Sequence, residues 1–233
     1  MQCWRGSGRA LALALTLDEI SLAPICRSVD PRGSFKKEHK QAQTFRYNHP
    51  MNRTPQITGT PDPIERLIAR LDADSASNDC TERCEAVKQT LIDEIGGRAL
   101  ALPAEFTRPC PDTYARRLLH KADRYAIVVM VWAAQQGTPI HDHDGKWCVE
   151  CVYDGTIRVR SFDLIGEPDD EIVSFRKAKE VSAHKGMAGS LIPPFDYHII
   201  ENPADDPAVT IHVYGGEMQG CHAYKELDDG RYK

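Results

Sequence analysis

The sequence lacks any long hydrophobic run. No apolar stretch approaches the roughly 18 residues that a membrane-spanning helix needs. The N-terminal segment is apolar only from Ala10 to Leu15, and it ends at Asp18 and Glu19 without an Ala-x-Ala cleavage site. We therefore expect neither a transmembrane segment nor a secretory signal peptide, and we expect the protein to be cytoplasmic.

The sequence also lacks an excess of positive charge. Its 29 Lys and Arg residues are outnumbered by 34 Asp and Glu residues, which gives a formal net charge of −5 and a pI of about 6.0. Binding to nucleic acid or to anionic membranes draws on clusters of basic residues. We expect neither kind of partner. The residues do not determine the oligomeric state, and we expect a monomer.

The eight cysteines lack the spacing of a disulfide framework or of a zinc site. They are scattered through 233 residues, a length that buries a hydrophobic core without such staples. Cys80 and Cys84 are spaced Cys-x3-Cys, but no second pair lies at a suitable distance. We therefore expect reduced thiols. Internal repeats and low-complexity tracts are absent as well.

The first half of the chain divides into two parts. Residues 1–61 are polar and rich in Gly, Pro, Arg, Asn and Gln, which predicts a mostly irregular extension. Residues 62–122 are predicted to form a helical cap. In this part PIERLIARLDADS begins with Pro63 in the first helical turn, and CTERCEAVKQTLIDEIGG, with Thr81 as its cap, stops at Gly96. The following PDTYARRLLH fits either a short helix or the entry to the first strand.

From Tyr125 onward, short apolar and β-branched runs alternate with Gly, Pro and Asp turns. The runs are YAIVVMVWAA, WCVECVYDG, TIRVRSFDL, EIVSFRK, GSLIPPFDYHII and AVTIHVYGGEM. Short strands at regular spacing indicate an antiparallel sandwich or barrel. We predict one domain that is mainly β, in which residues 123–233 form a barrel with a metal site and residues 62–122 pack on it.

Histidines mark that metal site. In PIHDHDGKWCVECVYDG, residues 139–155, strand alternation places His141 and His143 on one face and Asp142 on the other. An isolated pair of this kind is more often a polar feature at a strand end. His198 in PPFDYHIIENP alters that interpretation, because a barrel returns a later strand to the same wall. Three imidazoles on one wall predict a metal centre.

Both stretches resemble the two metal-binding motifs of the cupin superfamily. The first motif runs from a glycine through His-x-His to a glycine, and the second from a glycine through a proline to a histidine and an asparagine. The matching residues here are Gly137, His141, His143 and Gly155, and then Gly189, Pro193, His198 and Asn202. The resemblance implies a cupin (jelly-roll) β-barrel with N-terminal helices. Cupins usually place a glutamate four or five residues after the second histidine, where this chain has Trp147 and Cys148.

A cysteine at that position resembles the cysteine dioxygenases, mononuclear iron enzymes of the cupin superfamily that oxidise a thiol to a sulfinate. In that family the cysteine is joined by a thioether to a tyrosine near the last strand, and Cys148 and Tyr214 match the pair. The family's Ser-His-Tyr relay matches Thr210, His212 and Tyr214, with threonine in place of serine. Trp132 also stands at the family's spacing.

Residues on either side of these motifs extend the resemblance over residues 100–224. YARRLL resembles the family's Tyr-x-Arg segment, whose arginine holds the substrate carboxylate, so that Tyr114 and Arg116 are implied to bind the substrate. Arg117 is the alternative to Arg116. Cys221 and His222 in GCHAY also match. In place of the Ser-Pro that follows the tyrosine in animal members, this chain has Gly215-Gly216.

The resemblance implies an Fe(II) thiol dioxygenase that acts on a small thiol and O2. Its implied metal ligands are His141, His143 and His198, its catalytic residues Tyr214, His212 and Cys148, its substrate-binding residues Arg116 and Tyr114, and its supporting residues Thr210 and Trp132. The presence of both Cys148 and Arg116 favours L-cysteine as the substrate. 3-Mercaptopropionate and mercaptosuccinate are alternatives.

Two other interpretations use fewer of these residues. A non-catalytic metal-binding cupin needs only the three histidines, whereas the phenol relay of Tyr214 favours an enzyme. A zinc-dependent sugar-phosphate isomerase is disfavoured, because the usual glutamate and a basic phosphate cluster are both missing. Glu150 has the parity of Cys148, so if it faces the interior it needs a partner or is itself a ligand. His184 and His222 are interpreted as ordinary polar residues.

Overall fold

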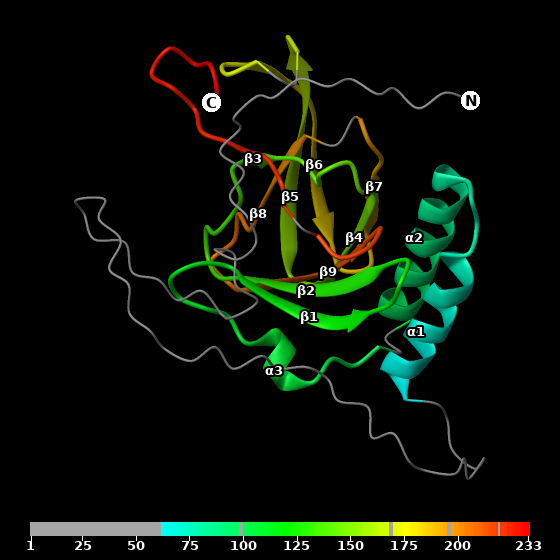
Figure 1. The fold of residues 1–233 in the computed structure, drawn as a ribbon. Coiled ribbons are helices and arrows are strands. Elements are labelled where there is room, and N and C mark those ends of the chain that lie inside the picture. Colours follow the sequence, from blue (N-terminus) through cyan, green and yellow to red (C-terminus); the bar gives the residue numbers. More distant parts are fainter. Residues whose placement is uncertain (1–61, 98–99, 168–169, 195–196, 219) are drawn as a thin grey trace, which may run out of the picture.

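The computed structural model describes residues 62–97, 100–167, 170–194, 197–218 and 220–233, so the irregular extension expected at residues 1–61 lies outside the described residues. The helices are α1 (Pro63–Asp74), α2 (Cys80–Gly96) and α3 (Ala104–Thr107). The strands are β1 (Ala115–Lys121), β2 (Ala126–Trp132), β3 (Ile140–His141), β4 (Cys148–Asp154), β5 (Thr156–Ile165), β6 (Ser174–His184), β7 (Ala188–Leu191), β8 (His198–Glu201), β9 (Ala208–Tyr214) and β10 (Ala223–Tyr224) (Figure 1).

The two long helices form where the sequence predicts them. Asp62 caps α1 by accepting hydrogen bonds from the backbone nitrogens of Ile64 and Glu65, and Pro63 occupies the first turn. The cap of α2 is Asp79, which accepts a bond of 2.9 Å from the Glu82 nitrogen; the expected cap at Thr81 is wrong. An Asp before the helix satisfies one of the orphan donors of the first turn, which is the task that the sequence assigns to a threonine.

A buried ion pair joins these helices. Glu94 on α2 accepts bonds from Arg66 at 2.8 Å and from Arg70 at 3.1 Å, both on α1. Their apolar faces turn the other way and pack on a sheet, with Leu67, Leu71 and Leu91 fully buried. The helices are therefore fixed to each other by charge and to the sheet by apolar contact.

Ten strands form two five-stranded sheets. One has the order β1-β2-β9-β4-β7 and the other the order β10-β3-β8-β5-β6, and the paired strands are antiparallel. The protein is therefore mainly β with N-terminal helices, as the sequence predicts. Within the described ranges no strand pairs across the two sheets, so they are not closed into a barrel by hydrogen bonds.

Strand β2 shows how the first sheet is buried on both faces. All seven of its residues are buried, which explains its uninterrupted apolar run. Ile127, Val129 and Val131 face the helices, whereas Val128 and Trp132 face the other way, into a second cluster that includes Tyr214. The first sheet thus separates an aliphatic core from the layer that holds Trp132, Cys148 and Tyr214, which are predicted site residues.

Some strands differ from the expectation. PDTYARRLLH enters a strand: residues 115–121 form β1, so the sheet begins at residue 115 rather than at residue 123, inside the segment expected to be helical. The short strands β3 and β10, which pair with each other, were not expected separately. Two-residue strands carry too little periodicity to be found in a sequence.

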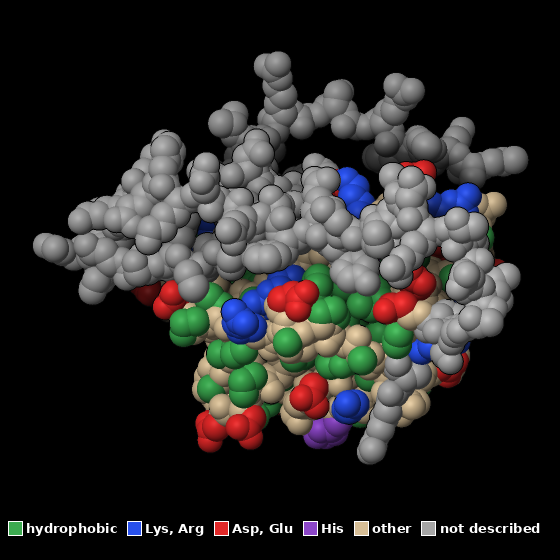
Figure 2. All heavy atoms as spheres, turned by 90° about the horizontal axis from the view of Figure 1, so that it is seen from below, with side chains coloured by type: hydrophobic (Ala, Val, Ile, Leu, Met, Phe, Trp, Pro, Cys, Tyr) green, Lys and Arg blue, Asp and Glu red, His purple; other side chains and the backbone are tan. Residues whose placement is uncertain are grey.

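The surface agrees with the mixed charge of the sequence. On the face drawn in Figure 2, acidic and basic side chains are interspersed among apolar ones wherever the described surface is visible. No helix in the described part of the chain is long and apolar enough to cross a membrane.

Candidate metal centre

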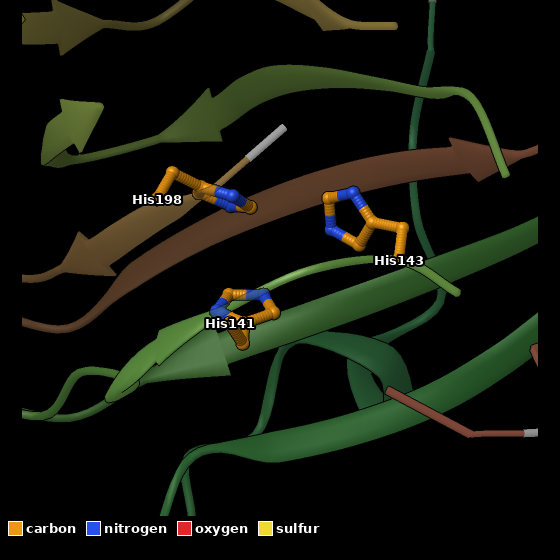
Figure 3. A group of neighbouring side chains, drawn as sticks. All are labelled: His141, His143 and His198. Carbon is orange, nitrogen blue, oxygen red and sulfur yellow. The ribbon is translucent and has the colours of Figure 1, made fainter. Parts of the chain in front are cut away.

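Three histidines converge although they come from distant parts of the chain. His141 ends β3 and is the direct register partner of His198 on β8, and His143 lies in the loop that follows β3. The ring centroids are 4.4 Å apart for His141 and His198, 5.0 Å for His143 and His198, and 5.3 Å for His141 and His143. The rings face one another in Figure 3, and one nitrogen of each lies within 4.8 Å of the others. The predicted triad is therefore brought together.

Burial keeps two of these rings, those of His141 and His143, neutral. His198 is 0% exposed and His143 is 2% exposed. Burial, together with the neighbouring His198, lowers the pKa of His141 to about 3, and burial with His198 and His141 lowers the pKa of His143 to about 2. A neutral imidazole presents a lone pair to a metal ion, so the donor set fits a divalent cation before any proton has to leave.

The loop that carries His143 is shaped by its own residues. The strand ends at His141, so strict alternation does not extend to His143 as expected. Instead Asp144 and Gly145 both have positive φ, 53° and 69°, and turn the chain back. Asp142 does point away from the triad: its Oδ1 accepts from the His222 backbone nitrogen at 2.9 Å, and its Oδ2 is 2.7 Å from His222 Nδ1. His222, interpreted from the sequence as an ordinary polar residue, fastens this loop.

Cys148 and Tyr214 lie directly opposite each other on neighbouring strands. They are register partners in the pairing of β4 with β9, and both are buried. Burial and the adjacent Cys148 raise the pKa of Tyr214 well above its ordinary value, so the phenol is protonated at neutral pH. The Tyr214 ring also lies 5.6 Å from the His143 ring, which places the pair beside the triad.

A chain of polar side chains leads from the interior to Tyr214. Trp132 Nε1 donates to Thr210 Oγ1 at 3.0 Å, Thr210 Oγ1 is 2.7 Å from His212 Nε2, and the Tyr214 hydroxyl is 3.4 Å from His212 Nδ1. An indole can only donate, so the threonine accepts from it and directs its own hydrogen to His212 Nε2. In this assignment the ring proton of His212 is on Nδ1, on the side of Tyr214.

The two neighbouring arginines of β1 point to opposite faces. The Arg116 guanidinium lies 5.6 Å from the centre of the Tyr214 ring. Arg117 instead donates to the backbone oxygen of Arg108 at 2.6 Å, on the other side of the sheet. Tyr114 lies on the inner side as well, with its ring 4.7 Å from that of Trp132. Arg116, and not Arg117, therefore faces the histidine site.

Gly215, which departs from the family's pattern, lies against Trp147. Its backbone nitrogen donates to the Trp147 oxygen at 2.9 Å, and a Cβ at this position would overlap the Trp147 indole ring. Trp147 precedes Cys148, and Gly215 follows Tyr214. The glycine therefore makes room for the indole beside the Cys148–Tyr214 pair.

Glu150 lies inside the site, in contact with two histidines, whereas the sequence leaves open whether it faces the interior. It is 8% exposed, and its Oε1 lies 3.2 Å from His198 Nε2 and 3.4 Å from His212 Nδ1. Burial works to raise the pKa of Glu150, but the His198 and His212 rings lower it well below the usual carboxyl range, so the group is ionised. The signal in the sequence is its parity with Cys148, which places both on one face of β4.

Comparison with known proteins agrees with this geometry. The family model described as "Cysteine dioxygenase type I" matches residues 102–227, more than half of the chain. Cysteine dioxygenase type 1 of Rattus norvegicus and that of Homo sapiens are each 24% identical to it over 115 residues, which are 48% of this chain and 56% of theirs. The chain therefore spans about half the length of the curated relatives it matches.

The solved structures that match this chain are more distant in sequence. A Thermus thermophilus protein is 20% identical, with a TM-score of 0.39 over 50% of this chain and 96% of that one. A Klebsiella pneumoniae protein described as having a double-stranded β-helix domain is 17% identical, with a TM-score of 0.40 over 55% of this chain and 97% of that one.

Proposed function

Since the chain belongs to the cysteine dioxygenase type I family of the cupin superfamily, we propose that it is a non-haem Fe(II) thiol dioxygenase. It would insert both atoms of O2 into a small thiol to give the sulfinate, with L-cysteine as the favoured substrate. The observation that carries the proposal is the pairing of Cys148 with Tyr214 directly beside the three histidines.

The histidines would hold the iron. His141, His143 and His198 supply three imidazole nitrogen donors, and neutral imidazoles by themselves do not reduce the positive charge of Fe(II). When bound, Fe(II) supplies the redox chemistry with O2 and lowers the pKa of a thiol that binds to it. Every further task in the reaction falls to the side chains around the triad.

Arg116 would hold the substrate through its carboxylate. A guanidinium matches a carboxylate with two parallel hydrogen bonds, and its position near the Tyr214 ring supports an approach from that side. This contact requires a thiol that carries a carboxylate. Cysteine, 3-mercaptopropionate and mercaptosuccinate meet this requirement, and cysteamine does not.

Tyr214 would hold a proton beside the reacting atoms. Its phenol is protonated at neutral pH. The hydrogen bonds from Trp132 to Thr210 and from Thr210 to His212 hold the imidazole of His212 next to the Tyr214 hydroxyl. A thioether to Cys148 would further restrict the rotation of Tyr214, so that the hydroxyl is already in place when the substrate binds.

The first test is oxygen consumption by the iron-loaded protein. Cysteine, 3-mercaptopropionate, mercaptosuccinate and cysteamine are supplied in turn, and the sulfinate product is identified by mass. We expect turnover of the thiols with a carboxylate, cysteine foremost, and little turnover of cysteamine. A preference for another thiol carboxylate would reassign the substrate. Absence of uptake with every thiol at full iron occupancy would favour a metal-binding cupin without turnover.

The cross-link has its own test. Formation of a thioether between Cys148 and Tyr214 removes two hydrogens with their electrons, for which O2 would be the oxidant, so the intact mass falls below the sequence mass by about 2 Da, the mass of those hydrogens. The variant Cys148→Ala should have its full calculated mass. A wild-type mass equal to that of the sequence would show that the thioether is absent from the isolated protein.

A further inference from the structure

Glu150 is a charged side chain inside the histidine site that the proposed reaction does not use. It lies on β4 two residues after Cys148, and its register partner on β9 is His212. Only 8% of its surface is exposed. A buried carboxylate costs free energy unless a cation or well-directed donors offset the lost hydration. Glu150 therefore needs a positive group or a set of aimed donors close to its oxygens.

Two histidine rings lie close to Glu150 Oε1. Within the described residues, no hydrogen bond of good geometry reaches Glu150 Oε1, although His198 Nε2 is 3.2 Å and His212 Nδ1 is 3.4 Å away. Donors at such distances that are not aimed at the oxygen stabilise it weakly. Glu150 Oε1 is therefore buried beside the triad without a donor aimed at it.

The spacing of its neighbours is that of metal ligands. Glu150, His143 and Cys148 form a second set of donor atoms that all lie within 4.8 Å of one another, and His143 also belongs to the histidine triad. Two ligands with bonds of about 2.1 Å to one ion lie about 3.0–3.5 Å apart in octahedral or tetrahedral geometry. The 3.2 Å between Glu150 Oε1 and His198 Nε2 falls within that range.

We propose that Glu150 is a fourth protein ligand of the metal ion held by His141, His143 and His198. The centre of this chain would then contain three imidazoles and one carboxylate, with the carboxylate placed on β4 two residues beyond Cys148. This inference rests on the metal assignment of the proposed function. The carboxylate oxygen cancels part of the ion's charge and leaves one position fewer for external ligands.

A cobalt titration tests the proposal without thiol or O2. The metal-free full-length protein is titrated with Co(II), and its visible absorption gives both the dissociation constant and, through band intensity, the coordination number. The variant Glu150→Gln keeps the shape of the side chain and a side-chain oxygen, but it loses the charge. We expect the dissociation constant to rise by at least about tenfold, because changes around metal ligands already cost this much, and we expect the cobalt bands to change.

A matched control is Glu201→Gln. Glu201 stands on β8 three residues after His198, and its carboxylate pairs with Arg158 at 3.1 Å and Arg160 at 2.8 Å, away from the triad. This variant should bind Co(II) as the wild type does. If Glu150→Gln also keeps the wild-type dissociation constant and spectrum, Glu150 is not a ligand and the proposal is wrong.

A second variant covers a failure of Glu150→Gln to fold. Glu150→Asp keeps the charge and withdraws the carboxylate by one methylene group, so a weaker Co(II) affinity supports ligation and an unchanged affinity contradicts it. The titration also separates this inference from the proposed function. A wild type that binds Co(II) with Glu150 but oxidises no thiol would refute the dioxygenase and leave the ligand in place.

Discussion

The two faces of the sheet β1-β2-β9-β4-β7 differ in the residues that they bury. The face toward the helices is aliphatic, with Val129, Ile211 and Val213 fully buried. The other face has Thr210 and His212 on the same strand, opposite Glu150 on β4. Successive side chains of a strand point to opposite faces, so β9 alone serves both. The sheet thus separates the aliphatic residues that stabilise the fold from the buried polar residues of the candidate site, although the two kinds alternate in the sequence.

The largest effect should come from removing a metal ligand. His198→Ala deletes a fully buried imidazole whose nitrogen belongs to the triad, so we expect iron binding to be abolished. Metal analysis of the purified protein measures this. His184→Ala removes an exposed imidazole that contacts Thr156 and should leave the iron content unchanged. An unchanged iron stoichiometry in His198→Ala would mean that the ligands are other residues.

A substitution on the helix-facing side should act on stability alone. Ile211→Ala removes a fully buried side chain between His212 and Thr210, and such truncations cost about 2–5 kcal/mol. Chemical denaturation of the metal-free protein should show this loss. The metal affinity of the folded variant should equal that of the wild type, and a large loss of affinity would show that the two faces are coupled.

Arg116 and Arg117 on β1 also allow the two faces of the sheet to be compared, because they point to opposite sides. Arg116→Gln should lower kcat/KM for cysteine about 10- to 100-fold, since a charged hydrogen bond contributes about 1.5–3 kcal/mol. Oxidation of cysteamine, which has no carboxylate, should change little. Arg117→Gln alters a contact with the Arg108 backbone and should leave kinetics unchanged. Equal losses with both thiols would remove the carboxylate role from Arg116.

The pH dependence of stability tests the neutral state of the triad. His143 has a pKa of about 2 in the folded protein, against about 6.5 in an unfolded chain. The unfolded state therefore binds the extra proton below pH 6.5, and stability falls as the pH falls. Between pH 6.5 and pH 5, this residue should lower the free energy of unfolding by about 2 kcal/mol. Above that window the titration of His143 should not change the free energy of unfolding.

Denaturation of the metal-free protein at several pH values between 7 and 5 measures this loss. His143→Gln cannot take up the proton and should have a shallower slope. A slope equal to that of the wild type would indicate that His143 titrates normally in the folded protein.

The smallest effect should come from Thr210. Thr210→Val keeps the shape of the side chain and removes the hydroxyl between Trp132 and His212, a change of about 0.5–1.5 kcal/mol. We expect kcat to fall by about tenfold at most while KM stays nearly constant. Thr210→Ser should retain the wild-type rate. An effect on KM alone would contradict a role in orienting His212.

Much of this arrangement could be predicted from the sequence. The long helices, the main strands and the alternation on β9 follow from periodicity, and the triad follows from the histidine motifs. The inward direction of Arg116 could not be chosen over that of Arg117, because strand parity is known only once the register of β1 with β2 is known. The cap at Asp79 was missed because Asp79 and Thr81 are both residue types that cap helices, and the sequence does not show at which of them the helix begins.

The remaining errors concern contacts between distant segments. Nothing near Asp142 in the sequence reveals that its partner is His222, eighty positions later. Glu150 on β4 has the parity that places it on the inner face of the first sheet. Its distance from His198 on β8 depends on how the second sheet packs against the first. Periodicity determines which face a side chain occupies, and only the packing of the two sheets determines which side chains meet.

The link between Asp142 and His222 has a consequence for hydrogen exchange. The Asp142 amide donates to the His222 oxygen at 3.1 Å, and the His222 amide donates to the Asp142 carboxylate at 2.9 Å. Both amide protons become exposed when the loop between His141 and His143 separates from the C-terminal segment. Their exchange rates therefore report on one opening event, the separation of Asp142, which lies between His141 and His143, from the C-terminal segment.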